Sequence, residues 1–528
     1  YPSNRFIFAE KENISSRYVR DIEVIPGCDY ETVHICSLSK HQIRSIAIQN
    51  FSSGDSSNIV DKILLCFKKT TLPRTPFVLS LILSLCDTAE FTPINEAVIM
   101  EQFMEYLLEK SDPLEAYSNT YDFRIKEDFL MHLVTYMNDR NKFCLSILEF
   151  EHVLSKYHEE IGFSISDTKF DRLFFEKGVL VRTELLVTFR YNCMVEYYLA
   201  KKAQHSPEFL SQIMSNRNYL NYTNELLYFT GLNRQNKEIV SILQEELSQY
   251  FERLKDLVPS LDEYNIGIDI SFPEDRFPEK IRESKLSQEQ SDKLQNTKDN
   301  SEVRIPEELD KQIAHEEMDA FINTLLVYGN CLKNLELLPK ECKEEMYDYY
   351  ILGLCIMLGI FKCSTEEFFN EKIYNMEQFP KKYSQKDMNE IKALMKDVLK
   401  ISLPLILQNI ALENIGTTKL KCIIEDKFKV KNRSEFSKFF SVFLYCDLRL
   451  PGLQNALKNY CTDAKDKSLL KIIFFKLLYY YRFRYFSSSL DPFLENILAD
   501  INIKLNNGGK RRKGIIIQEL KNQKKLLS

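Results

Sequence analysis

Apolar residues recur every three or four positions along most of this chain, a spacing that places them on one face of an α-helix. In the first half the spacing is clear over Pro76 to Cys86, Ile94 to Glu109 and Glu127 to Met137. In the second half it predicts a series of long helices: Leu309 to Lys333, Glu344 to Phe361, Lys386 to Leu412, Arg433 to Tyr445 and Lys467 to Phe486. The pattern therefore predicts a mainly α-helical protein.

The alternation of apolar and polar residues that is typical of β-strands is confined to a few short segments. Arg5 to Ala9 and Glu31 to Cys36 are strand candidates, and Val179 to Val181 faces Leu186 to Phe189 across a short polar turn, which predicts a hairpin. Predicted helices precede and follow this hairpin: Glu127 to Met137, Leu148 to His158, Lys169 to Lys177 and, after it, Arg190 to Ala203. Three helices closed by a hairpin are the order of a winged helix.

Composition supports a folded protein of several domains. The chain has 528 residues, of which 44% are apolar, and a net charge of only -6, so neither a disordered chain nor a uniformly basic nucleic-acid-binding surface is expected. Only 14 glycines and 16 prolines argue against turn-rich β architectures. The stretch from Pro273 to Pro306 is rich in Glu, Lys, Ser and Gln and predicts a polar linker between two helical bodies.

The cysteines favour a reducing, cytoplasmic location. All 13 occur singly, without a CxxC spacing, which is typical of buried free thiols. The longest apolar stretch, Tyr349 to Phe361, is shorter than a membrane span requires and predicts a core helix. No membrane partner is expected.

Sequence motifs for catalysis are missing, and no catalytic or metal-binding residue is predicted. The histidines form no HExxH motif, and no GxSxG elbow occurs. The glycines of Gly508-Gly509-Lys510 lack the upstream glycine and the following hydroxyl of a phosphate-binding loop, so this chain alone is expected to hold no cofactor. The basic run from Lys510 to Lys513 either contacts phosphates or an acidic protein, or simply solvates the terminus.

Three segments resemble NACHT-type STAND ATPases, which are NLR-like switches. Cys36 to Ile43 (CSLSKHQI) resembles the step from a strand into the helical lid, and Leu72 to Leu81 (LPRTPFVLSL) resembles the lid motif whose proline lies against adenine. Val187 to Ala200 (VTFRYNCMVEYYLA) is similar to the family's winged-helix signature. The resemblance implies nucleotide-binding roles for Pro76, Arg190 and Tyr191. Many relatives have histidine where this chain has Tyr191, so either Arg190 or Tyr191 is the expected phosphate donor.

The resemblance also implies a domain order. The expected parts are the end of a NACHT core of the AAA+ type (1–38), a helical lid (39–120), a winged helix (121–205), a second helical domain (206–272), a linker (273–306) and an all-helical sensor (307–528). The Walker A and Walker B segments and an N-terminal effector would lie before Tyr1. Arg5 to Ala9 and Glu31 to Cys36 would then be the last strands of the core.

The function implied by this family is a signal-dependent switch. ATP or ADP with Mg is the expected cofactor of the full-length parent, which would hydrolyse ATP. The C-terminal helices would recognise a trigger protein, in bacteria commonly of phage origin, and control oligomerisation and effector activation in antiviral defence. Nucleic acid is an unlikely partner because the Glu159 to Asp171 segment is acidic.

Two other interpretations of the sequence stay open. The chain could be a helical scaffold or interaction protein without a nucleotide switch, which a native start at Tyr1 would support. It could also be a winged-helix DNA-binding regulator, which would require a basic recognition helix and strongly salt-dependent binding.

Overall fold

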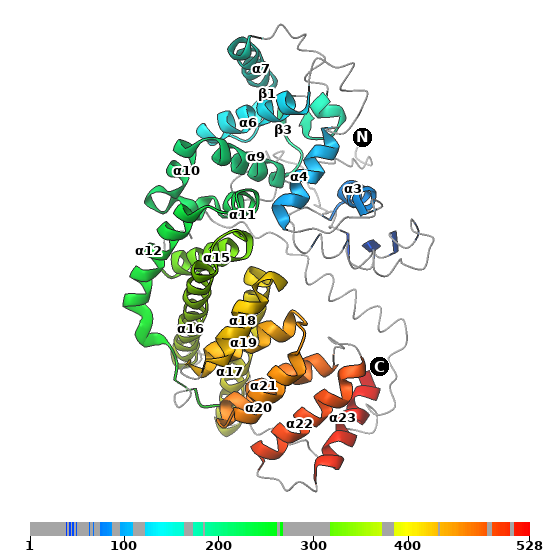
Figure 1. Cartoon of the computed structure of the whole chain (residues 1–528), viewed down its shortest axis with the longest axis vertical. Coiled ribbons are helices and arrows are strands. Elements are labelled where there is room, and N and C mark those ends of the chain that lie inside the picture. The colour runs from blue at the N-terminus through cyan, green and yellow to red at the C-terminus, as the bar shows by residue number, and fades with distance from the viewer. Residues whose placement is uncertain are drawn as a thin grey trace, which may run out of the picture. The chain divides into compact units, whose positions relative to one another are not determined.

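Helices dominate the computed structural model of the chain, which confirms the mainly α prediction (Figure 1). The structure describes scattered positions between 38 and 67 and the ranges 74–86, 95–108, 122–162, 173–182, 185–260, 264–267, 317–371, 385–430, 433–482, 488–506 and 512–527. The predicted strands Arg5 to Ala9 and Glu31 to Cys36, the linker Pro273 to Pro306 and the glycines Gly508 and Gly509 lie outside these residues.

The chain divides into two compact units. Unit 1 comprises Tyr1–Arg234 with Asp292–Ala320, and unit 2 comprises Gln235–Ser291 with Phe321–Ser528. The domain limits expected from the sequence do not coincide with this division, since the expected domain 206–272 spans the boundary at residue 234, and they stay predictions.

Unit 1 contains short helices and a small sheet. Its elements are α3 (Pro76–Cys86), α4 (Glu96–Leu107), α6 (Phe123–Asp139), β1 (Leu145–Ser146), α7 (Ile147–Ile161), β2 (Leu180–Arg182), β3 (Leu186–Phe189), α9 (Asn192–His205), α10 (Pro207–Met214), η1 (Ser215–Asn221) and α11 (Thr223–Leu232). Local signals set several ends: Ser146 and Glu149 form a capping box at the start of α7, and Gly162 ends it with φ 69°.

The sheet of unit 1 is antiparallel, with the strand order β1-β3-β2. Leu180 pairs with Phe189 and Arg182 with Val187, which confirms the predicted hairpin. The sequence did not predict β1, which adds Leu145 opposite Val187 on the other edge of β3. The hairpin passes directly into α9, so the sheet determines where α9 begins.

Helix α9 is the centre of unit 1 and packs against both α6 and α11 (Figure 1). Met194, Tyr197, Tyr198 and Leu199 on α9 are fully buried. A helix that is apolar on nearly all sides can only be stable when other elements surround it, and α6, α10 and α11 pack against α9 here.

Unit 2 is all helical in its described residues. It contains α12 (Lys237–Leu254), η2 (Lys255–Leu257), most of α15 (Glu317–Asn334), α16 (Lys340–Glu371), α17 (Gln385–Ile415), η4 (Thr418–Leu420), α18 (Lys421–Lys429), α19 (Glu435–Asp447), α20 (Leu453–Asp463), α21 (Lys467–Arg482), η5 (Ser488–Leu490), α22 (Asp491–Leu505) and α23 (Lys513–Leu527).

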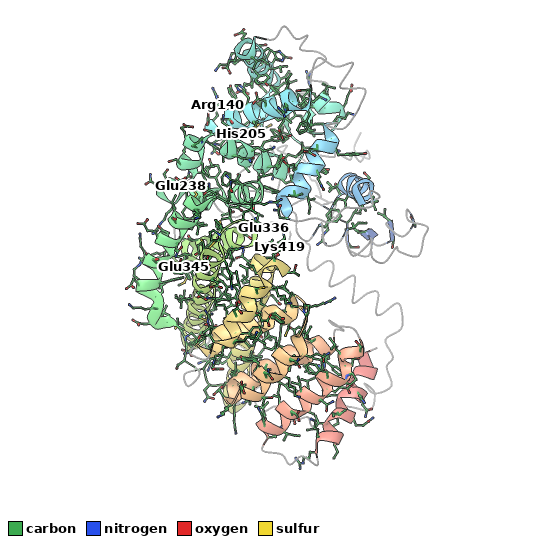
Figure 2. All side chains as sticks on the ribbon, in the orientation of Figure 1. Arg140, His205, Glu238, Glu336, Glu345 and Lys419 are labelled. Carbon is green, nitrogen blue, oxygen red and sulfur yellow. The ribbon has the colours of Figure 1, made fainter. Side chains whose placement is uncertain are left out.

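Polar contacts between helices supplement the apolar core of unit 2. Lys419 pairs with Glu336, and Gln244 on α12 donates to Glu345 on α16 at 2.6 Å (Figure 2). At the core, the carboxylate of Asp447 accepts hydrogen bonds from Lys476 at 3.1 Å and from Tyr480 at 2.5 Å. Asp447 and Lys476 are almost fully buried, so each charge depends on the other for solvation.

Two helices among the described residues are long and apolar enough to cross a membrane: Lys340–Glu366 and Ala393–Ile415. In their most apolar windows, 67% and 39% of the residues are buried inside the protein. Core helices of soluble proteins meet the same criteria. The predicted core stretch Tyr349 to Phe361 lies within the first of these helices, and most of its residues are buried.

Candidate functional site

The three segments that resemble the STAND family meet in unit 1. The backbone N–H of Leu38 donates to the carbonyl of Arg74 at 2.8 Å, which joins the first segment to the second. The hydroxyls of Thr75 and Tyr191 lie 3.2 Å apart, which joins the second segment to the third across 116 residues of sequence. Pro76 and Tyr191, the two positions expected to contact nucleotide, are therefore brought together.

The start of α3 is built by Thr75 and Pro76. The Thr75 hydroxyl accepts a hydrogen bond from the N–H of Val78 at 3.3 Å, as an N-cap residue does. Pro76 occupies the first helical position, where the missing N–H of proline costs nothing. The Pro76 side chain is exposed, so its ring can contact another molecule.

The start of α9 is built by Arg190 and Tyr191. The N–H of Arg190 donates to the carbonyl of Val179 at 2.9 Å, which extends the hairpin by one bond. Tyr191 is the N-cap residue of α9, with extended backbone angles and no side-chain cap. Its side chain instead reaches Thr75, and the guanidinium carbon of Arg190 lies 5.8 Å from the centre of the Tyr191 ring. Both residues are partly exposed.

Charged and buried contacts hold α9 in this position. Lys201 on α9 pairs with Glu127 on α6 at 3.1 Å and lies 3.7 Å from Glu101 on α4. Burial raises the pKa of Tyr197 and of Tyr198 well above the usual value, and the charge of Glu127 raises both further. Both hydroxyls therefore stay neutral at physiological pH, and the core around α9 carries no tyrosinate charge.

Helix α4 is attached to α11 by a close contact. Asn95 caps α4 through Val98 and donates from its side-chain nitrogen to the carbonyl of Gly231 at 3.2 Å. A Cβ added at Gly231 would lie 2.6 Å from the Cβ of Ala97, so glycine is required for this approach. Because α11 also packs on α9, α4 and α9 belong to one packed core.

This arrangement offers hydrogen-bond donors to an anion. The Tyr191 hydroxyl, the Arg190 guanidinium and the start of α9 lie together, and each favours a negatively charged oxygen. An exposed proline beside them suits a flat apolar ring, so the donor set fits a nucleotide. Among the residues that the structure describes, no group of His, Cys, Asp and Glu is arranged to hold a metal ion.

Two members of this cluster, Arg74 and Thr75, were not predicted as site residues from the sequence. Thr75 had a recognisable signal, because a threonine before a helix that starts with proline is an N-cap candidate. Its second role, the contact with Tyr191, had no local signal. The roles of Pro76, Arg190 and Tyr191 in nucleotide binding stay predictions.

Comparison with known proteins gives one family match. Residues 144–199 match the family described as novel STAND NTPase 4. No curated protein and no solved structure matched the chain. The matched part contains β1, α7, the hairpin and the start of α9, and therefore includes Arg190 and Tyr191 but not Pro76. The match supports a STAND NTPase-like family for this part of the chain.

Proposed function

We propose that this chain is the regulatory and sensing part of a STAND NTPase switch of the NACHT type. In this proposal unit 1 supplies a helical lid and a winged helix that close over a bound ATP or ADP. The helices of unit 2 recognise a trigger protein, and the switch controls oligomerisation and effector activation in bacterial antiviral defence. The phosphate-binding loop is expected upstream of Tyr1, because the resemblance begins with the segment that leaves the nucleotide-binding core.

The contact between Thr75 and Tyr191 carries this proposal. A switch of this type requires that the lid proline and Tyr191 of the winged-helix signature face one ligand, and Thr75, the neighbour of that proline, contacts Tyr191 across 116 positions of sequence. A helical scaffold without a switch has no such requirement. The helix, strand and hairpin order of residues 123–189, with its three-stranded sheet, supports the winged-helix assignment.

Bound nucleotide would supply a polyphosphate anion with Mg and a flat adenine ring. Tyr191 and Arg190 would donate to phosphate oxygens, and the exposed ring of Pro76 would cover the adenine. A ligand held by two packed elements at once stabilises the arrangement that satisfies both. Loss of one donor should therefore shift the population away from the closed, resting state.

The test uses the full-length protein and measures release of a fluorescent ADP analogue. Tyr191→Phe removes only the hydroxyl, and Arg190→Gln removes the charge. We expect release to accelerate by about 10- to 100-fold for each, since one charge-assisted hydrogen bond contributes about 1.5–3 kcal/mol. Oligomers should form without trigger, as measured by light scattering.

Tyr222→Phe is the matched control. The Tyr222 hydroxyl donates to Asn138 at 3.1 Å within the same unit, away from Thr75 and Pro76. It should change folding stability slightly and ADP release not at all. If Tyr191→Phe and Arg190→Gln release ADP at the rate of the Tyr222→Phe protein, the nucleotide site assigned to these residues is wrong.

A further inference from the structure

A short segment after α12 lies against three helices of unit 2 that are distant in sequence. Residues 264–267 (Tyr-Asn-Ile-Gly) contact α17, α19 and α21 through hydrogen bonds and ring packing. We call Lys400, Phe436, Ser468 and Lys471, which these residues contact, the docking surface. The segment and the docking surface belong to the same unit.

The hydroxyl of Tyr264 compensates for a proline inside α17. In a helix the carbonyl of Lys400 would accept from the N–H of residue 404, but Pro404 has no N–H. The Tyr264 hydroxyl donates to this carbonyl at 2.6 Å. A buried carbonyl without a donor is costly, so this position specifically favours a side chain with a hydroxyl at its end.

The backbone of the segment is recognised by side chains of two helices. The Lys400 ammonium donates to the carbonyl of Asn265 at 2.8 Å, and the Lys471 ammonium donates to the carbonyl of Ile266 at 2.6 Å. The N–H of Ile266 donates to the Ser468 hydroxyl at 3.1 Å. These bonds would form with any extended peptide, because they use main-chain atoms.

Two side chains of the segment supply the specificity. Tyr264 is fully buried and meets the Phe436 ring edge to face at 5.0 Å, and Ile266 is 2% exposed. The intervening Asn265 is exposed. A Cβ at Gly267 would lie 3.1 Å from the Asp397 carboxylate, so glycine leaves that side chain where it is. The pattern selected is tyrosine, any residue and an aliphatic residue, followed here by glycine.

We propose that the docking surface is a peptide-recognition site that residues 264–267 occupy in cis, and that a partner protein displaces them with an extended Tyr-x-Ile-Gly-like segment. Three of the four hydrogen bonds given above use main-chain atoms of the segment, so a segment of another protein with the same two buried side chains could form them. The claim that this site senses the trigger rests on the proposed function. The claim that the docking surface binds a peptide does not.

A peptide attached to its own site competes strongly. A short connection produces an effective concentration in the millimolar range, so a free partner must bind more tightly than the cis segment or act at high local concentration. Because residues 264–267 occupy the site, only a partner that outcompetes them, by affinity or by local concentration, can bind there. Displacement of residues 264–267 would then free the chain that follows α12 from its attachment to α17, α19 and α21.

The experiment uses the whole 528-residue chain and a fluorescent peptide with the sequence of residues 259–268. In the Tyr264→Ala/Ile266→Ala variant the cis segment no longer fills the site. We expect the peptide to bind this variant about 100-fold more tightly than wild type, by anisotropy. A peptide with phenylalanine in place of its tyrosine should bind the variant about tenfold more weakly, because the Lys400 carbonyl then lacks a donor.

Further variants locate the binding. Adding Ser468→Ala or Lys471→Met to the double variant should weaken peptide binding about tenfold, whereas Lys458→Met, exposed on α20, should have no effect. Absence of binding to a double variant that melts cooperatively would overturn the proposal. So would equal binding to wild type, or equal binding of the phenylalanine peptide.

Hydrogen exchange on the wild-type chain decides the matter if the double variant does not fold. The Ile266 amide should exchange at least about tenfold faster than the buried Ile472 and Ile473 amides of α21, and excess peptide should accelerate it further. Equal protection would show that residues 264–267 are a permanent part of the core. A concentration-dependent dimer of wild type would show instead that a second copy exchanges this segment. ADP release from the Tyr191 site is unaffected by these outcomes, so the two proposals fail separately.

Discussion

The hydroxyls of Thr75 and Tyr191 lie 3.2 Å apart, at the starts of two different helices. Thr75 also caps α3 by accepting from the N–H of Val78, so its own proton is free to be donated toward Tyr191. Tyr191 can in turn donate its proton to another acceptor. The pair therefore holds the Tyr191 hydroxyl beside the first turn of α3.

The first prediction is that Thr75 and Tyr191 are energetically coupled. In a double-mutant cycle with Thr75→Val and Tyr191→Phe, urea unfolding of the chain should give an interaction energy of about 0.5–1.5 kcal/mol. Thr75→Val by itself should lower the free energy of unfolding by about 1 kcal/mol beyond the loss of this interaction, because α3 also loses its N-cap. In the control cycle, the effects of Thr75→Val and Tyr222→Phe on the free energy of unfolding should add. An interaction energy of similar size in the control would mean that both cycles report a general destabilisation of unit 1.

The second prediction concerns nucleotide affinity of the chain by itself. The printed sequence contains no phosphate-binding loop, and the donors near Tyr191 are partly exposed. Isothermal titration with ADP or ATP should therefore detect no tight binding, with any Kd weaker than about 1 mM. Micromolar binding would show that the chain binds the phosphates through a site that lacks a known phosphate-binding motif.

The third prediction is a pH dependence at the start of α7. Hydrogen bonds from Lys142 and then from Ser146 lower the pKa of Glu149 to about 2. A carboxylate with a lowered pKa stabilises the fold above its ordinary pKa of about 4.5 and loses this contribution as the pH falls toward 2. Glu149→Gln should lower stability by about 0.5 kcal/mol near neutral pH, since the pair is largely solvent-exposed, and the difference should vanish in acid.

Thermal melts followed by circular dichroism at neutral and acidic pH measure this effect. Glu151, exposed on the same helix, provides the control, because Glu151→Gln makes the same change of charge away from the capping box. A difference between wild type and Glu149→Gln that grows as the pH falls would contradict the assignment.

The fourth prediction concerns the buried charges of unit 2. Lys476→Met would leave the Asp447 carboxylate buried without its cation and should destabilise the chain by about 3–5 kcal/mol in urea unfolding. Adding Asp447→Asn removes the orphaned charge and keeps an acceptor for Tyr480, so part of the loss should return. Lys458→Met, at an exposed position, should be nearly neutral; a small effect of Lys476→Met would mean that water reaches Asp447.

The candidate site was only partly predictable. Arg190, Tyr191 and Pro76 were singled out by family resemblance, and the contact between Thr75 and Tyr191 brings the start of α3 to the start of α9. Thr75 was missed because its hydroxyl has two roles, and only the helix cap has a pattern in the sequence. The strand β1 was missed because a two-residue strand is too short to show alternation.

The sequence by itself determined the mainly helical character and several individual helices. It predicted both ends of α3, Pro76 and Cys86, and the pairing of the β2–β3 hairpin, because capping, helical periodicity and tight turns depend on residues a few positions apart. It did not predict that Tyr191 reaches Thr75 or that Tyr264 supplies the donor that Pro404 removes, 136 residues from the Lys400 carbonyl that accepts it. Such contacts are decided by how whole helices pack, and the free energy of packing depends on the surfaces that meet in space, which local spacing does not encode.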